Sequence, residues 1–198
     1  LPLRLVRSAP SPLGLYIRAG RADQKDLQTF LPAGVAGLTG VVFEAKRVGQ
    51  QRELLSLVLE RGLDAILDPQ TQAMATPGGY AKSMDSLPWS AKRQSAIEDF
   101  GTPIQRRQIT DEIAKFAVLH GFTQILAPTH VLVGPEDPWL AVDRALTEGL
   151  RAALQRQGAL GIQIQYSLAL SYEAFRTAKK RMAVVEVLPR QSIDGLWL

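Results

Sequence analysis

The sequence contains no cysteine. This excludes disulfide bonds, thiolate nucleophiles and metal or iron–sulfur sites built on cysteine. No apolar run approaches the roughly 18 residues that cross a bilayer, and residues 1–12 lack the apolar stretch and cleavage site of a signal peptide. We therefore expect a protein of the cytoplasm with no membrane-spanning segment.

Histidine is also scarce, since the 198 residues include only two, His120 and His130. Neither belongs to a His-Glu-x-x-His or His-x-x-x-His spacing, so no zinc site is predicted. The P-loop, the Gly-x-Gly-x-x-Gly dinucleotide fingerprint and the Gly-x-Ser-x-Gly nucleophile elbow are missing as well. The sequence therefore assigns no cofactor.

Charge of one sign is not concentrated anywhere in the chain. Lys and Arg number 23 against 19 Asp and Glu, a net charge of +4, and the basic residues are scattered in short groups. This mild excess suits an anionic ligand, whereas a nucleic-acid footprint usually gathers Lys and Arg on one face. Nucleic acid is therefore the weaker of the two predicted partners.

What the chain does contain is a recurring unit of a glycine, a short apolar strand, a polar loop and an amphipathic helix. The strand segments are near-continuous apolar runs, which is typical of parallel strands buried beneath helices. The expected strands are residues 13–20, 37–46, 62–69, 121–128, 160–170 and 193–198.

The segments between these strands carry helical periodicity. Thr110 is predicted to cap one helix at its N-terminus, and glycines are predicted to end three helices. The apolar faces and stop signals are Leu27, Phe30 and Leu31; Leu54, Leu57 and Val58 before Gly62; Ile113, Phe116 and Ala117 before Gly121; Trp139, Val142, Leu146, Leu150 and Leu154 before Gly158; and Phe175, Ala178, Met182 and Val185 after Ser171.

Strands that alternate with helices must run parallel and be joined by right-handed crossovers. Such a sheet closes into a barrel or stays open and doubly wound; the tight spacing of the first three strands and the missing dinucleotide fingerprint favour the barrel. In this the whole chain resembles the TIM-barrel superfold, by architecture and not by any motif. We predict one α/β domain over residues 1–198, an incomplete barrel of about six strands.

Two segments depart from a regular barrel. The last apolar strand ends with the chain, and because an exposed strand edge invites pairing, we expect a second copy, another chain or further residues to complete the sheet. Residues 69–108 form a long, turn-rich connection, which in a compact domain is usually functional. We predict that this connection is a lid over the carboxyl ends of the strands.

Ligands of parallel α/β proteins bind at the carboxyl ends of the strands. Asp68 directly follows the apolar residues of the third strand and His130 follows the fourth strand, so both are candidate acid–base residues. Each also has a structural interpretation, because Asp68 precedes Pro69 and Asp-Pro commonly starts a turn. His130 would then be a hydrogen-bonded side chain beneath the lid.

The ligand-binding candidates are Arg18, Glu44, Lys46, Trp89 and Tyr166. Arg18 and Lys46 are predicted to clamp a phosphate or carboxylate, with an ion pair to Glu44 as the alternative. Trp89 would cover the ligand from the lid or merely anchor it. The strand pattern is compatible with either alternate set of side chains facing the barrel interior.

These candidates predict an enzyme that acts on a small anionic or phosphorylated ligand at the mouth of the barrel. The alternative is a non-catalytic module that binds nucleic acid or a partner chain. The fold by itself does not choose between them, because unrelated functions share the same barrel.

Overall fold

The computed structural model describes residues 15–19, 38–69, 103–127, 138–167, 183, 188 and 192–197. Within these residues one sheet has the order β1-β2-β3-β4-β5-β6, and each strand pairs in parallel with the next along the chain. The strands are β1 (Leu15–Arg18), β2 (Leu38–Glu44), β3 (Asp64–Asp68), β4 (Gln124–Leu126), β5 (Gln163–Ser167) and β6 (Gly195–Trp197).

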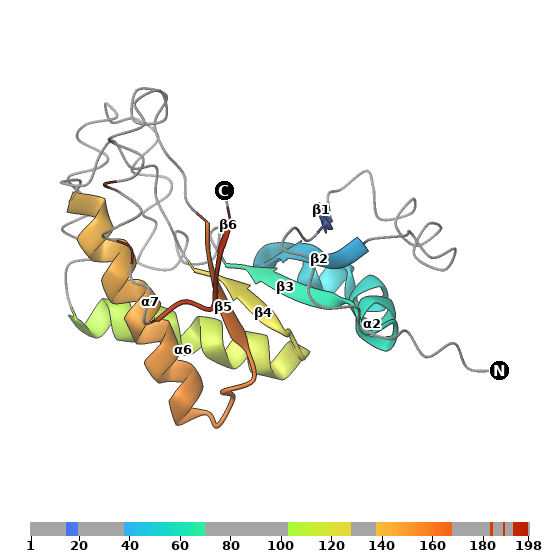
Figure 1. Ribbon diagram of the computed structural model, residues 1–198. Helices are drawn as coiled ribbons and strands as arrows, with labels where there is room; N and C mark the ends of the chain where they lie inside the picture. The colour runs from blue at the N-terminus through green and yellow to red at the C-terminus, as the bar shows by residue number, and fades with distance from the viewer. Residues whose placement is uncertain are drawn as a thin grey trace, which may run out of the picture.

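The described helices are α2 (Arg52–Glu60), α6 (Pro103–His120) and α7 (Pro138–Arg156), and a 3-10 helix, η1 (Ala45–Gln50), directly follows β2. The sheet curls into an open half-barrel rather than a flat layer (Figure 1). All six predicted strand segments contain an observed strand, which confirms the incomplete α/β barrel. None of the described helices is long and apolar enough to cross a membrane.

The larger apolar core lies between the sheet and the helices, on what we call the outer face. Alternate strand residues such as Phe43, Leu67 and Ile164 pack there with buried residues of all three described helices. Burial of each large apolar side chain contributes about 1.5–3 kcal/mol, so this layer supplies most of the stabilisation. A doubly wound sheet would carry helices on both faces, and the described helices share one core.

The opposite, inner face of the sheet carries a smaller apolar cluster of Val42, Ile66 and Leu126, with Tyr16 packed against it. Side chains alternate between the faces along a strand. Glu44 and Asp68 therefore lie on the inner face, two residues beyond Val42 and Ile66. Arg18 lies there too, because it is the register partner of Val42. The structure thus shows which set of side chains faces the interior.

The predicted helix ends are confirmed at Gly62, Gly121 and Gly158, which have φ angles of 66°, 72° and 67°. Glycine adopts this left-handed conformation without the steric cost of a Cβ atom and so ends helices readily.

The predicted cap at Thr110 is wrong, because α6 begins at Pro103. Proline is well suited to the first turn of a helix, because N–H groups there have no partner within the helix and proline has no N–H group. Thr110 lies inside the helix, and its Oγ1 donates to the carbonyl oxygens of Arg106 and Arg107 at 2.9 and 3.1 Å. Residues 103–108 of the predicted lid are therefore helical, and residues 70–102 lie outside the described part.

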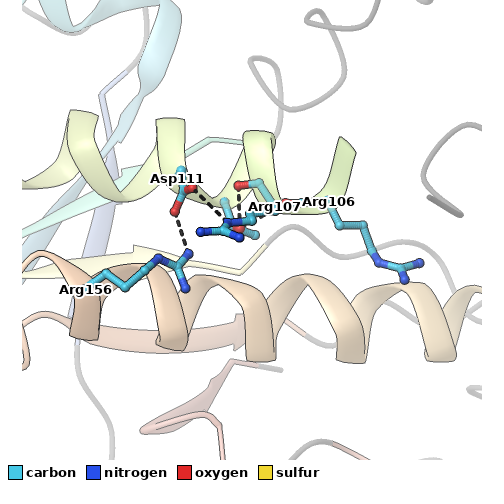
Figure 2. A network of polar contacts seen from close by, with 5 residues as sticks. Arg106, Arg107, Asp111 and Arg156 are labelled. Carbon is cyan, nitrogen blue, oxygen red and sulfur yellow. Dashed lines mark hydrogen bonds and ion pairs between the residues drawn. The ribbon is translucent and has the colours of Figure 1, made fainter. Parts of the chain in front are cut away.

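Helices α6 and α7 pack closely at Gly149. A Cβ atom at Gly149 would lie 3.2 Å from Cγ2 of the buried Thr110, so the missing side chain permits this approach. At the surface Asp111 accepts from Arg156 at 2.6 Å and lies 3.8 Å from Nε of Arg107 (Figure 2). Such exposed pairs contribute only about 0–1 kcal/mol, so apolar contact dominates.

Close pairing of β2 and β3 predicts the effect of a methyl group at Gly40. A Cβ atom there would lie 2.5 Å from the backbone oxygen of Asp64, which cannot move without shifting the sheet. We expect Gly40→Ala to lower the free energy of unfolding by about 1–3 kcal/mol, measured by denaturant titration. Gly49→Ala is the matched control, because its Cβ would meet nothing within 4 Å. Equal stability of the two variants would contradict this packing.

Candidate functional site at the carboxyl ends of the strands

An ion pair joins the carboxyl ends of β1 and β3 across the inner face. Nη1 of Arg18, the last residue of β1, donates to Oδ2 of Asp68, the last residue of β3. The Asp68 side chain is 7% exposed and that of Arg18 is 52% exposed. The carboxylate is therefore buried, while the guanidinium that neutralises it remains open to solvent.

A second ion pair lies beside the first. Glu44 ends β2 and is the register partner of Asp68. Directly opposed carboxylates repel each other unless cations offset their charge. Nε of Arg47, in η1, lies 3.1 Å from Oε2 of Glu44. The two adjacent strand ends thus hold two carboxylates, each with its own arginine.

The backbone around η1 fixes this arrangement. The N–H of Ala19 donates to the carbonyl oxygen of Val42 at 2.8 Å, which extends the pairing of β1 and β2 by one residue beyond Arg18. Gln51, which follows η1 and is buried, donates from Nε2 to the carbonyl oxygen of Ala19 at 3.4 Å. These contacts hold the ends of β1 and η1 together, and so they position Arg18 and Arg47.

The structure brings together Arg18, Glu44 and Asp68 of the predicted site residues. Arg18 pairs with Asp68 and Arg47 pairs with Glu44, while the clamp of Arg18 with Lys46 stays a prediction. The backbone of Lys46 lies in η1, and its side chain is outside the described part. The sequence reasoning missed Arg47, although its spacing of three from Glu44 suits a helical turn that begins where the strand ends.

Two further candidates, Trp89 and His130, lie outside the described residues. Their predicted roles stay predictions. Ala127, the last described residue after β4, is three positions before His130.

Tyr166 lies on the outer face and is separated from the other candidates. Its side chain is fully buried, and its hydroxyl donates to Oδ2 of Asp143 in α7 at 3.3 Å. Burial, followed by the charge of Asp143 and this hydrogen bond, raises the pKa of Tyr166 well above its usual value. The structure therefore places the Tyr166 side chain in the core beneath α7, on the face of the sheet opposite to Arg18, Glu44 and Asp68, and we exclude it from the candidate site.

The arginines of this site are the groups that can bind an anion. In the part of the chain that the structure describes, no three His, Asp or Glu side chains gather as metal ligands would. The two carboxylates are paired with arginines, and a guanidinium presents a planar fork of N–H donors that matches phosphate or carboxylate. Arg18 is oriented by the buried carboxylate of Asp68 and is half exposed. Its guanidinium is therefore the group best placed to meet an anion from solvent.

Comparison with known proteins found no match from which a function could be inferred. The sequence matches no protein-family model, and no curated protein is detectably similar to it.

The buried carboxylate of Asp68 predicts an energetic coupling with Arg18. Exposed ion pairs are weak, whereas a buried charge that loses its partner is costly, and this pair lies between these limits. We expect Arg18→Gln to lower the free energy of unfolding by about 1–2 kcal/mol, and by less than about 0.5 kcal/mol in an Asp68→Asn background. Denaturant titration of the four proteins measures this coupling. Additive effects would show that the pair contributes nothing.

The core position of Tyr166 predicts a structural effect with a pH signature. Tyr166→Phe removes a hydrogen bond to a carboxylate and should cost about 1–3 kcal/mol near neutral pH. Because the folded-state pKa of Tyr166 is raised above 10.0, its contribution is present below pH 10 and is lost as the pH rises above that value. The difference in melting temperature between wild type and variant should therefore shrink above pH 10. A difference that stays constant there would contradict the buried phenol.

Proposed function

We propose that the protein binds a small phosphorylated or carboxylated ligand at the carboxyl ends of β1, β2 and β3, and that it acts on this ligand as an enzyme of the TIM-barrel type. One observation carries the proposal. Arg18 is half exposed, while the carboxylate that orients it is buried. An anion from solvent can therefore reach the guanidinium, whose orientation is fixed from its buried side.

The ion pair also prepares Arg18 for binding. A long side chain that is ordered on binding loses up to about 2 kcal/mol of rotamer entropy. Asp68 already restricts Arg18, so part of this cost falls on folding rather than on ligand binding. A preorganised guanidinium binds its anion more tightly than a mobile one for this reason.

The location supports the proposal independently. Ligands of parallel α/β barrels bind where the strands end, and catalytic groups come from the ends of several strands. In this proposal Asp68 orients Arg18 and takes part in proton transfer only when a ligand displaces the guanidinium. His130, in the segment after β4, is the proposed acid–base residue.

A second candidate function has one observation in its favour. Arg107 and Arg156 both engage the single carboxylate of Asp111, and Arg106 lies one position away on α6 (Figure 2). This local excess of positive charge on α6 and α7 suits a polyanion such as nucleic acid. Binding of that kind would weaken steeply as the salt concentration rises.

Inorganic phosphate tests the proposed function directly. At ten times its dissociation constant, phosphate should stabilise the wild-type protein by about 1.4 kcal/mol, or about 3–6 °C in melting temperature. Arg18→Gln should abolish this shift, even after the shift is referred to the variant's own melting temperature without phosphate.

Arg156→Gln is the matched control, because it removes the same charge from the surface of α7. It should keep the full phosphate-induced shift. A shift lost in Arg156→Gln and kept in Arg18→Gln would reject the site at the strand ends and favour the second candidate.

A further inference from the structure

A continuous row of side chains crosses the inner face of the sheet from the end of β1 to the first residues of β4 and β5. Arg18 in β1 is the register partner of Val42, Val42 of Ile66, Ile66 of Gln124, and Gln124 of Gln163 in β5. The row is cationic at one end, apolar in the middle and amide-bearing at the other end. A complete TIM barrel usually fills such layers with bulky branched side chains, so the two glutamines are unusual there.

Gln124 is the member of this row whose side-chain oxygen lacks a partner among the described residues. The residue is only 4% exposed, and its Oε1 is buried with no hydrogen-bond partner in the part of the chain that the structure describes. A buried acceptor without a donor is destabilising, and such atoms are rare in native proteins. This oxygen can therefore accept a hydrogen bond from an N–H or O–H group that lies outside the described part of the chain.

The amide group of Gln124 is already oriented by Tyr16. Burial raises the pKa of the Tyr16 phenol, and the charge of Asp64 raises it further. The hydrogen bond between Tyr16 and Gln124 lowers this pKa. A hydrogen bond lowers a phenol pKa when it is donated to the phenol oxygen. The Gln124 N–H therefore points to Tyr16, and this leaves Oε1 as the available acceptor.

Further amides lie beside Gln124 on β5. Nε2 of Gln165 donates to Oε1 of Gln163 at 3.2 Å. Gly195 in β6 is the register partner of Gln165, and a Cβ atom at Gly195 would collide with the Gln165 amide. Glycine at this position thus leaves room for the amide, and β4 and β5 together present uncharged hydrogen-bonding groups.

We infer that the ligand of this protein is a hydroxylated anion such as a polyol phosphate, with its anionic group at Arg18 and a hydroxyl that donates to Oε1 of Gln124. Val42 and Ile66 lie between these two ends in the row, and Tyr16 packs against them. A mostly apolar surface with a few placed polar groups is the usual composition of a small-molecule site.

The spacing of the two ends suits a ligand of several carbon atoms. Arg18 and Gln124 are three strand spacings apart, about 14 Å along the sheet. The curl of the sheet and the length of the Arg18 side chain shorten this span. The inference rests on the proposed function, because it assigns the second end of a ligand whose first end is held by Arg18.

Three probes test the inference by isothermal titration calorimetry on the full chain. They are inorganic phosphate, glucitol 6-phosphate and hexyl phosphate, which share the anionic group and differ in the chain attached to it. We expect glucitol 6-phosphate to bind wild type about tenfold more tightly than inorganic phosphate, the factor that one satisfied buried acceptor supplies. Equal affinities would overturn the inference and leave the proposed function standing.

The variant Gln124→Met keeps the side-chain volume and removes the acceptor. It should weaken glucitol 6-phosphate about tenfold and leave hexyl phosphate and inorganic phosphate unchanged. Gln155→Met, the same change at an exposed position of α7, is the control and should leave all three affinities as in wild type. Unaltered glucitol 6-phosphate binding in Gln124→Met would overturn the inference. If the wild-type protein bound none of the three probes, this result would contradict the proposed function and therefore also the inference.

Discussion

Parallel pairing between strands that follow one another in the chain is the constraint on which the rest of the structure depends. Each crossover returns the chain to the same end of the sheet, so the carboxyl ends of all the strands face one way. The alternation of side chains then sends Phe43, Leu67 and Ile164 toward the helices and the polar residues Arg18, Glu44 and Asp68 inward. A slip of one residue in β3 would exchange the core with the site.

The inner face combines a common barrel feature with an unusual filling. Val42, Ile66 and Leu126 make it apolar at the centre, as in other barrels, but charged and amide groups border that centre on two sides. Burial of Asp68 and of the Gln124 amide is unfavourable for folding unless each finds a partner. Asp68 finds one in Arg18, and the hydroxyl of the inferred ligand would be the missing partner of Gln124.

Much of this fold could be predicted from the sequence, because apolar runs and glycine stops are local signals. The six strands and the ends of α2, α6 and α7 followed from them. The start of α6 could not be predicted in the same way. Threonine often caps helices, and the sequence does not show that the Thr110 hydroxyl instead donates to the backbone of the preceding helical turn. Tyr166 was misplaced because near-continuous apolar strands hide which side chains face inward. The polar residues that interrupt such runs, Gln124 above all, were the unused signal for the inner face.

Nuclear magnetic resonance of the arginine side chains offers the most direct test of whether Arg18, at the strand ends, receives an anion. With the Nε–Hε signals assigned through single Arg→Lys variants, inorganic phosphate is titrated into the wild-type protein. We predict that the Arg18 signal shifts and saturates first, while those of Arg107 and Arg156 change little. Saturable shifts confined to Arg107 and Arg156, with Arg18 unmoved, would contradict an anion site at the strand ends.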